Sequence, residues 1–555
     1  MFKKVGLYYR TIKHLKPIQI RYRLWYIFRD KFRNLTGHTY PLSIPKEGNS
    51  LNLIEGCPSS VICRPSSKAF TFLNQPHTFE ETIDWNVSKY GKLWAYNLNY
   101  FEYLRQPDLT KEEGLKLIRE FIDQIESNRE GLEPYPISLR GINWIVFLSE
   151  HNIKEKEIDA SLYGQYQILL DNLEYHLLGN HLLENGCSLL FGACYFQDKE
   201  LYEKAEQILG NQLEEQILDD GGHFERSTMY HCILLERLMD CYNLMESNSL
   251  KKSDGLKEKL ATKIRLMLGW LDKMTIDCRP GTEDGEELFV NGPPSSIKEP
   301  PLFNDGAKDV APSPEELFVY AERLEVKARS VQLSESGYRK FSTERFNLIC
   351  DVGEVGPDYQ PGHAHSDTFS FVLYMDGKPV IIDPGISTYE NSARRQQERS
   401  TAFHNTVQYR DKEQSEVWSG FRVGRRARVE VKAENDKELI AAHDGYRPWR
   451  ITHERKWVVE EGYICIKDRL VGKEGAAGRF YVHFHPSLLG ELSVEDNCIK
   501  VGVIDIEFES ADKIKKYSYD CPNGYNQYIK APKIEVQFVS ELESRISLNI
   551  EDEML

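Results

Sequence analysis

The sequence predicts an all-α half followed by an all-β half, and three observations support that prediction. Apolar residues recur at helical spacing between residues 80 and 275, as in segments 115–122, 166–170 and 205–209. Seven prolines then interrupt regular structure between residues 280 and 314. After about residue 330 the apolar period becomes two, which is typical of strands. The expected divisions are residues 1–79 as an N-terminal extension, 80–325 as a helical domain and 326–555 as a β domain.

Short polar connections join the expected helices, as residues 218–222 illustrate. Short connections place consecutive helices side by side as antiparallel hairpins, and many hairpins in a row indicate a solenoid or a toroid. The proline-rich segment is interpreted as a linker or a long active-site loop. A last helix is expected over residues 314–324, which closes the first half.

The second half contains clear hairpin signals. Residues 369–375 and 378–382 are apolar runs that flank Asp376-Gly377, a dipeptide that favours tight hairpin turns. Residues 457–466 repeat that design around Glu461-Gly462, and another strand is expected over 479–485. Many short strands of this kind predict an antiparallel β-sandwich.

Composition excludes several classes of function. The formal net charge of −16 argues against a general nucleic-acid binder. No run of about 18 apolar residues is present, so no integral membrane segment is expected. The basic and aromatic residues 18–32 predict a helix packed on the main domain, with a membrane-surface helix as the alternative.

Cysteines and the N-terminus give an expectation about location. The eleven cysteines show no Cys-x-x-Cys spacing, which indicates reduced thiols in a reducing compartment. Basic residues interrupt the apolar positions near the N-terminus, so no signal peptide is recognised. A cytoplasmic location is therefore expected, with the periplasm as the alternative.

Three residues of the β half are candidate metal ligands. His365, Asp383 and His404 are spaced 18 and 21 residues apart. Two imidazoles and one carboxylate suit Zn²⁺, with Mn²⁺ or Fe²⁺ also possible. The simpler interpretation is that His363 and His365 are ordinary strand histidines and that Asp383 only begins a turn.

The helical half contains a second polar cluster. His181 and Glu184 lie three residues apart, so on a helix they share a face, and Glu184 could orient the imidazole. Asn180 adds an amide beside them, and Tyr230 follows among other polar residues. The simpler interpretation is structural, since helix tyrosines usually pack in cores and Asn-His pairs often cap helices.

Together these motifs resemble the heparinase II/III-like polysaccharide lyases. The resemblance rests on the order of five motifs along most of the chain: Asn180-His181 with Glu184, Ser227 to His231, Gly362 to Asp367, Asp383-Pro384-Gly385 and His404-Asn405-Thr406. It implies an N-terminal (α/α) toroid followed by a C-terminal antiparallel β-sandwich. It also implies cleavage of a uronic-acid-containing polysaccharide by β-elimination, so the expected partner is an anionic polysaccharide.

The resemblance also implies roles for particular residues. Asn180 and His363 would neutralise the uronate carboxylate, and His181 and Tyr230 would be the base and acid pair. Glu184 would be a supporting carboxylate. The structural divalent metal, with zinc as the first choice, would be held by His365, Asp383 and His404.

Three further residues are candidate substrate contacts. Arg140 could pair with a carboxylate or sulfate, and Trp144 could stack on a sugar ring. A buried helix start explains both equally well, because residues 145–148 continue as an apolar run. Arg399 belongs to the arginine-rich region after the His-x-His motif, a composition that favours an anionic ligand as well as a solvated sheet face.

Two alternative functions remain open from the sequence. A cupin-like metal enzyme would explain His363-x-His365 with His404, but Phe369 and Ser370 stand where cupins place a glutamate. A non-catalytic uronan-binding protein of a bacterial polysaccharide pathway would keep the lyase scaffold without turnover.

Overall fold

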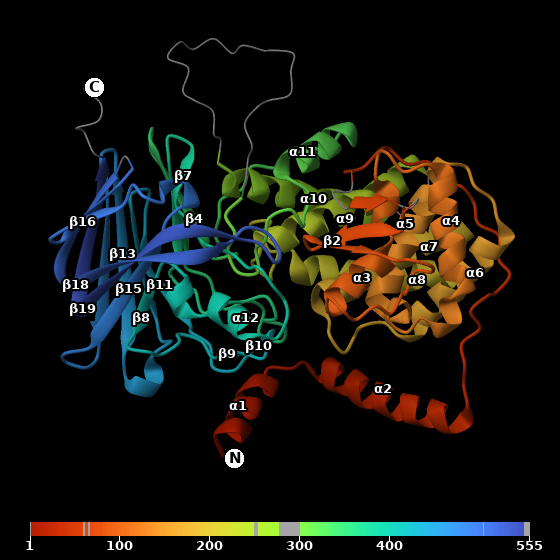
Figure 1. The fold of residues 1–555 in the computed structure, drawn as a ribbon, viewed down its shortest axis with the longest axis horizontal. Coiled ribbons are helices and arrows are strands. Elements are labelled where there is room, and N and C mark those ends of the chain that lie inside the picture. The colour runs from red at the N-terminus through yellow and green to blue at the C-terminus, as the bar shows by residue number, and fades with distance from the viewer. Residues whose placement is uncertain are drawn as a thin grey trace, which may run out of the picture.

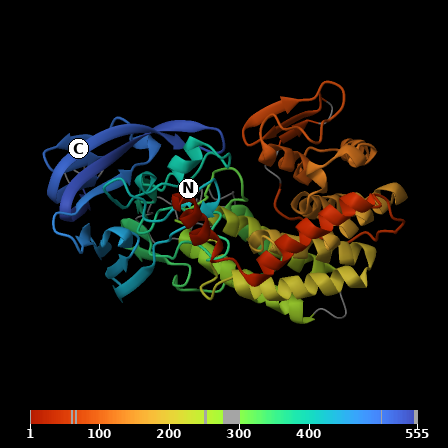
Figure 2. The ribbon, with the colours of Figure 1, turned by 90° about the horizontal axis from the view of Figure 1, so that it is seen from below.

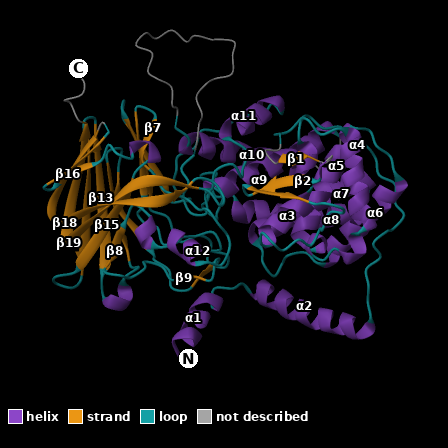
Figure 3. Ribbon diagram, viewed as in Figure 1, coloured by secondary structure: helices purple, strands orange, loops and turns teal. Residues whose placement is uncertain are grey.

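The computed structural model describes residues 2–58, 62–64, 67–248, 254–276, 300–502 and 504–548. A helical half and a strand-rich half lie side by side, as the secondary-structure colours of Figure 3 show. The predicted fold class is confirmed. Pro280, Pro293 and Pro294 of the proline-rich segment lie outside the described residues.

The helical half is a ring of antiparallel helix pairs, seen at the right of Figure 1. It contains α3 (Lys92–Tyr100), α4 (Lys111–Asp123), α5 (Pro134–Glu150), α6 (Lys156–Asp171), α7 (Gly179–Phe196), α8 (Lys199–Gln216), α9 (Thr228–Ser247), α10 (Asp254–Met274) and α11 (Pro314–Arg323). Local sequence explains their ends. In α4, the Thr110 hydroxyl accepts from the backbone N–H of Glu113, while the Glu113 side chain accepts from the Thr110 N–H.

Two helices and a small sheet precede the ring. Helices α1 (Phe2–Ile12) and α2 (Pro17–Thr36) lie on the outer surface, and β1 (Ile62–Arg64), β2 (Ala69–Phe72) and β3 (Gln75–Thr78) form an antiparallel sheet. The aromatic side chains of β2 pack on the ring, with Phe72 meeting Trp94 of α3 at 4.9 Å between ring centroids. The small sheet is therefore attached to the helical half.

The β half consists mainly of two antiparallel sheets. The smaller has the order β4 (Tyr338–Ser342), β5 (Phe346–Asp351), β6 (Phe371–Met375), β7 (Lys378–Ile381). The larger has the order β11 (Val429–Glu434), β12 (Glu438–His443), β13 (Thr452–Glu460), β14 (Tyr463–Val471), β19 (Tyr528–Leu548), β18 (Ile504–Pro522), β17 (Cys498–Val501), β16 (Ser493–Glu495). There β15 (Ala477–His483) pairs with β19 and with β8 (Val407–Tyr409).

Turn chemistry sets the register of the predicted hairpin in the smaller sheet. Met375 of β6 pairs with Lys378 of β7 across the two-residue turn. Asp376 and Gly377 have φ angles of 47° and 73°, a left-handed pair that Asp-Gly tolerates and most dipeptides do not. The same two-residue spacing joins β13 to β14, where Glu460 pairs with Tyr463.

An apolar cluster joins the two halves. Trp270 and Met274 of α10 pack with Tyr338, Ile349 and Val372 of the smaller sheet. The indole N–H of Trp270 also donates to the Ser336 hydroxyl at 3.0 Å. Because these side chains are buried, the halves form one packed body, and the polar residues beside this contact hold fixed positions.

Candidate active site

The first turn of α7 places Asn180 and His181 at the junction of the two halves. The turn starts from an unusual backbone, because Leu178 has φ 64° and ψ −154° and Gly179 has φ 62°. A Cβ on Gly179 would lie 2.9 Å from Glu225 Oε1, and the positive φ strains any other residue there. A bulky residue at positive φ is costly, and strain of this kind is concentrated at functional sites.

His181 is held by Glu174, which precedes α7. Its Nδ1 lies 2.9 Å from Glu174 Oε1, and the Asn185 amide donates to Glu174 Oε2 at 3.0 Å. Burial alone would lower the pKa of His181, but the Glu174 carboxylate outweighs it and raises that pKa. The imidazole remains 30% exposed and packs against the tilted ring of Tyr135, so it is open to a ligand.

Tyr230 comes from the first turn of α9, which Ser227 caps. The Tyr230 ring lies over the His363 ring with 3.9 Å between centroids, and the Tyr389 hydroxyl donates to the Tyr230 hydroxyl at 3.0 Å. Burial raises the pKa of Tyr230 well above its usual value, and the Tyr389 hydrogen bond opposes that shift only partly. Tyr230 therefore keeps its proton near neutral pH.

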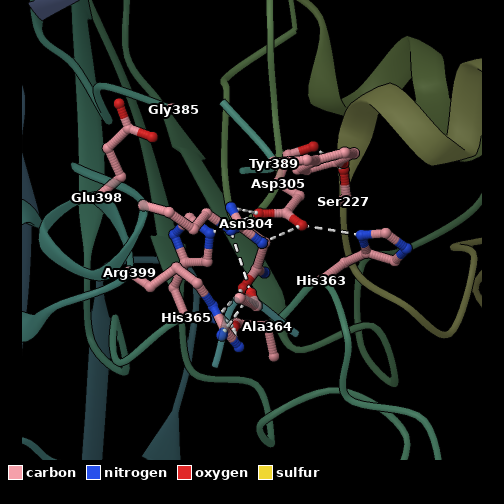
Figure 4. A network of polar contacts seen from close by, with 12 residues as sticks. Ser227, Asn304, Asp305, His363, Ala364, His365, Gly385, Tyr389, Glu398 and Arg399 are labelled. Carbon is pink, nitrogen blue, oxygen red and sulfur yellow. Dashed lines mark hydrogen bonds and ion pairs between the residues drawn. The ribbon is translucent and has the colours of Figure 1, made fainter. Parts of the chain in front are cut away.

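Asp305 connects the two histidines of the His-x-His motif (Figure 4). Its carboxylate oxygens lie 2.8 Å from His363 Nδ1 and 2.8 Å from His365 Nε2, and Arg395 donates to it at 2.7 Å. Burial acts to raise the pKa of Asp305, but Arg395 and the two histidines hold it well below its usual value. The charged carboxylate fixes the orientation of both imidazoles.

Asn180 and His363 converge on one carboxylate, that of Glu225. The Asn180 backbone N–H donates to Glu225 Oε1 at 3.3 Å, and its side-chain amide donates to Oε2 at 3.4 Å. His363 Nε2 lies 3.6 Å from the same Oε2. The two residues predicted to neutralise a carboxylate are thus spaced to contact one, although they come from different halves of the chain.

The predicted metal ligands form one buried chain of contacts. His365 Nδ1 lies 3.2 Å from His404 Nε2, while His404 Nδ1 lies 3.0 Å from Asp383 Oδ2. Asp383 and His365 therefore meet opposite nitrogens of the His404 ring. In the part of the chain that the structure describes, no group of three or more His, Cys, Asp or Glu side chains is arranged to hold a metal ion.

Part of this cluster nevertheless fits a metal. Two ligands of a tetrahedral Zn²⁺ lie ~3.3 Å apart, close to the separation of the facing nitrogens of His365 and His404. Burial lowers the pKa of His365 to about 3, so its imidazole is neutral, as a ligand must be. Asp383 outweighs burial at His404 and raises the pKa of that imidazole to about 9, so a metal that binds there has to displace a proton. Asp383 supports His404 from behind in this arrangement. The metal stays a prediction.

Three predicted substrate contacts are wrong. Trp144 is fully buried among core aromatics, and Arg140 is fully buried with its guanidinium donating to Gln165 Oε1, Asn99 O and Gly131 O. Arg399 is buried as well and donates to the Ala364 and Gly420 carbonyls. These side chains brace the structure, because all three are buried and the hydrogen bonds of both guanidinium groups go to protein atoms.

Glu184 was predicted to orient His181, and that role belongs to Glu174. Glu184 is completely buried and accepts from Arg237 at 3.0 Å, which in turn donates to Asp240. Sequence spacing indicated Glu184 because it lies one helical turn from His181. Glu174 was missed because it lies before the helix, where helical spacing gives no information.

Sequence reasoning also missed Glu225, Asp305 and Tyr389. Asp305 falls in the proline-rich segment, for which the sequence predicts a linker or a long active-site loop. Glu225 lies three residues after Gly222 in the turn before α9, close to the Ser227 to His231 motif. Only the fold brings these residues to the two histidines.

Two family profiles match the chain in the expected order. The profile described as Heparinase II/III N-terminus matches residues 142–280, and the one described as Heparinase II/III-like, C-terminal, matches residues 325–529. The chain belongs to the heparinase II/III-like family. Members of that family are polysaccharide lyases, and a match to both halves excludes the cupin-like alternative.

Solved structures show the same fold. A crystal structure of heparinase III superposes with a TM-score of 0.65 at 14% identity, covering 85% of this chain and 80% of that one. A heparinase III gene product with methylated lysines gives 0.58 at 15%, covering 88% and 83%. A mutant of the heparan sulfate lyase HepC from Pedobacter heparinus gives 0.56 at 14%, covering 87% and 81%. No curated protein matches the chain.

Proposed function

We propose that this protein cleaves a uronate-containing polysaccharide by β-elimination. The observation that supports the proposal most is the convergence of Asn180 and His363 on the Glu225 carboxylate. A uronate carboxylate held by such a pair would find one neutral amide donor and one imidazole. The family membership of both halves supports the same reaction class.

The reaction needs that contact because the C5 proton of a uronate is barely acidic. Removing it places negative charge on a group that already carries a carboxylate. Donors aimed at the carboxylate stabilise the charge that develops, which is usually the largest contribution to catalysis. Asn180 and His363 fill this role in the proposal, and Asp305 keeps the His363 ring in place.

The remaining steps require a base and an acid near the C4–O4 bond. The base takes the proton from C5, the electron pair forms the C4–C5 double bond, and the C4–O4 bond breaks. The leaving O4 then receives a proton. His181 and Tyr230 perform these transfers in the proposal, and the raised pKa of Tyr230 suits it to donate the proton to O4.

A structural divalent metal, with zinc as the first choice, belongs to the proposal. His365 and His404 would hold it, with Asp383 supporting or completing the site. Metal analysis of purified protein tests this point without an activity assay. One equivalent of zinc per chain is expected in the wild type. The His365→Ala, His404→Ala double variant is expected to lose it. Wild-type protein without metal would contradict the metal proposal.

The substrate class can be tested with matched polymers. Ultraviolet absorbance of the new C4–C5 double bond would be followed on a panel of uronate polysaccharides, each paired with its carboxyl-reduced form. A signal on one polymer, absent from its reduced form, is expected. Binding of the polymer without any signal would favour the non-catalytic uronan-binding alternative. The cytoplasmic location, or the periplasmic alternative, is to be tested by cell fractionation.

A further inference from the structure

Helices α1 and α2 lie on one outer face of the molecule, outside both cores. Figure 1 shows them along the lower edge, α1 beside the β half and α2 beside the helical half. Figure 2, seen from below, shows both helices crossing the face nearest the viewer. Their side chains are arranged differently from those of an ordinary surface helix, which buries an apolar stripe and exposes polar residues.

The inner side of α2 is polar and aromatic. Gln19 donates to the Leu177 carbonyl at 3.0 Å, Arg29 donates to the Asp171 carbonyl at 2.6 Å, and Arg33 pairs with the Asp171 carboxylate. Tyr22 and Tyr26 complete this stripe at spacings of three and four residues, with Tyr22 stacked on Tyr175. Hydrogen bonds and ion pairs, with these tyrosine contacts, therefore attach α2 to the body.

The outer side of α2 is apolar. Leu24 is 64% exposed, Phe28 65% and Leu35 87%, and these positions follow one helical face. The same side of the helix also carries the exposed side chains of Ile20, Trp25, Ile27 and Phe32. Continuous apolar exposure on this scale marks an interaction surface, since monomeric proteins rarely leave one uncovered.

Helix α1 repeats the arrangement on the β half. Arg10 forms a two-point ion pair with the Glu416 carboxylate, and Tyr8 meets the Trp418 ring at 5.2 Å between centroids. Val5, Tyr9 and Ile12 point away from the body and are exposed. Separate anchors therefore hold the two helices to the body, and each helix leaves an apolar side exposed.

The charge of this surface indicates what covers it. Residues 1–36 contain ten Lys and Arg, one Asp and no Glu, whereas the whole chain has a formal net charge of −16. Exposed Arg21 and Lys31 lie within the apolar side of α2 itself. Protein interface cores are depleted of lysine, but a lipid interface favours aromatic and aliphatic residues interleaved with basic ones.

We propose that α1 and α2 seat this protein on an anionic lipid membrane, lying in the plane of its interface. Trp25, Phe28 and Phe32 enter the boundary between headgroups and acyl chains, while Arg21 and Lys31 meet lipid phosphates. The helices do not cross the bilayer, since no described helix is long and apolar enough to do so. This surface is independent of the residues proposed for lyase chemistry.

Vesicle flotation of the full-length protein tests the proposal. Vesicles of phosphatidylcholine alone would be compared with vesicles that also contain phosphatidylglycerol. Binding to the anionic vesicles only is expected, weakening as salt is raised. Arg21→Gln and Lys31→Gln are each expected to weaken binding about fivefold, as expected for one basic residue near an anionic surface.

The triple variant Leu24→Ser, Phe28→Ser, Leu35→Ser is expected to weaken binding at least about tenfold. Its matched control is Leu489→Ser, Ile529→Ser, Val539→Ser, which removes three apolar side chains of the β half that are 43% to 49% exposed and should bind like wild type. The fluorescence of Trp25 should shift to shorter wavelength on vesicle binding, and Trp25→Phe should remove that shift.

Several results would overturn the proposal. The proposal is contradicted if wild-type protein does not bind anionic vesicles, or if it binds neutral vesicles equally well. Undiminished vesicle binding by the α2 triple variant contradicts it too. If wild type instead forms a dimer that the same triple variant dissociates, the apolar surface is an interface between two copies of this chain.

Discussion

At the scale of single residues, Glu174 sets the protonation of His181. Because the carboxylate raises the pKa of His181, the imidazolium form is stabilised at low pH and that stabilisation is lost as pH rises through the raised pKa. Glu174→Gln should lower this pKa, so the limb of the pH–rate profile that belongs to His181 should move to lower pH. Profiles of kcat/KM measure this shift.

The direction of that limb also identifies the role of His181. A limb that rises with pH indicates a base, and one that falls indicates an acid. Glu133→Gln is the control, because that carboxylate binds Lys92 and Tyr96 and does not contact His181. A Glu174→Gln profile identical to wild type would show that His181 does not control the rate.

Tyr230 is expected to be indispensable for turnover and dispensable for binding. Tyr230→Phe keeps the ring that packs on His363 but removes the proton donor, so kcat should fall by about 10²–10⁴. Tyr389→Phe removes the hydrogen bonds of that hydroxyl with Tyr230 and Tyr525, and a loss of about tenfold or less is expected. Rate assays measure the effect on turnover, and calorimetry measures the effect on polymer binding. A fully active Tyr230→Phe variant would show that Tyr230 is not the proton donor.

Trp144 shows why some residue assignments from sequence failed. Arginine beside tryptophan suggests a sugar subsite, but burial depends on which helices surround α5, and a single sequence does not specify that. Trp144→Ala should lower the free energy of unfolding by about 3–5 kcal/mol and leave KM unchanged. Trp25→Ala, at an exposed position, should change stability by less than about 0.5 kcal/mol. Denaturant unfolding measures the stability of both variants. A changed KM in Trp144→Ala without loss of stability would show that Trp144 does contact the substrate.

At the scale of elements, helices and hairpins were predictable where the pattern is local. The apolar stripe of residues 115–122 became α4, and the Asp376-Gly377 turn joined β6 to β7 as expected. The loop between β5 and β6 has no such pattern. Its conformation depends on distant partners, including Asp305 and Arg399, so the sequence indicated its histidines but not their geometry.

Arg399 should matter because it holds that loop. Its guanidinium donates to the Ala364 carbonyl from two nitrogens and to the Gly420 carbonyl from a third. A lysine cannot reproduce this fork, so Arg399→Lys should lower kcat about tenfold and speed hydrogen exchange over residues 362–367. Arg422→Lys, at an exposed arginine, should change neither quantity. Unchanged exchange in the Arg399 variant would contradict the bracing role.

At the scale of the whole molecule, the site exists only because the two halves pack together. Asn180, His181 and Tyr230 come from the helical half, whereas His363 and Tyr389 come from the β half. The order of motifs along the chain was enough to predict both halves and the family. It did not reveal Glu225 or Asp305, because their roles arise from contacts between segments far apart in sequence. It did not reveal Glu174 either, because that residue lies before α7, where helical spacing gives no information.

The central claim is that this assembled site performs elimination on a uronate polymer. The most direct test is mass spectrometry of products formed in water labelled with heavy oxygen. Elimination adds no water, so the account predicts chains that end in an unsaturated uronate and gain no heavy oxygen in the cleavage step. Products that carry one heavy oxygen and no double bond would show hydrolysis and would contradict the account.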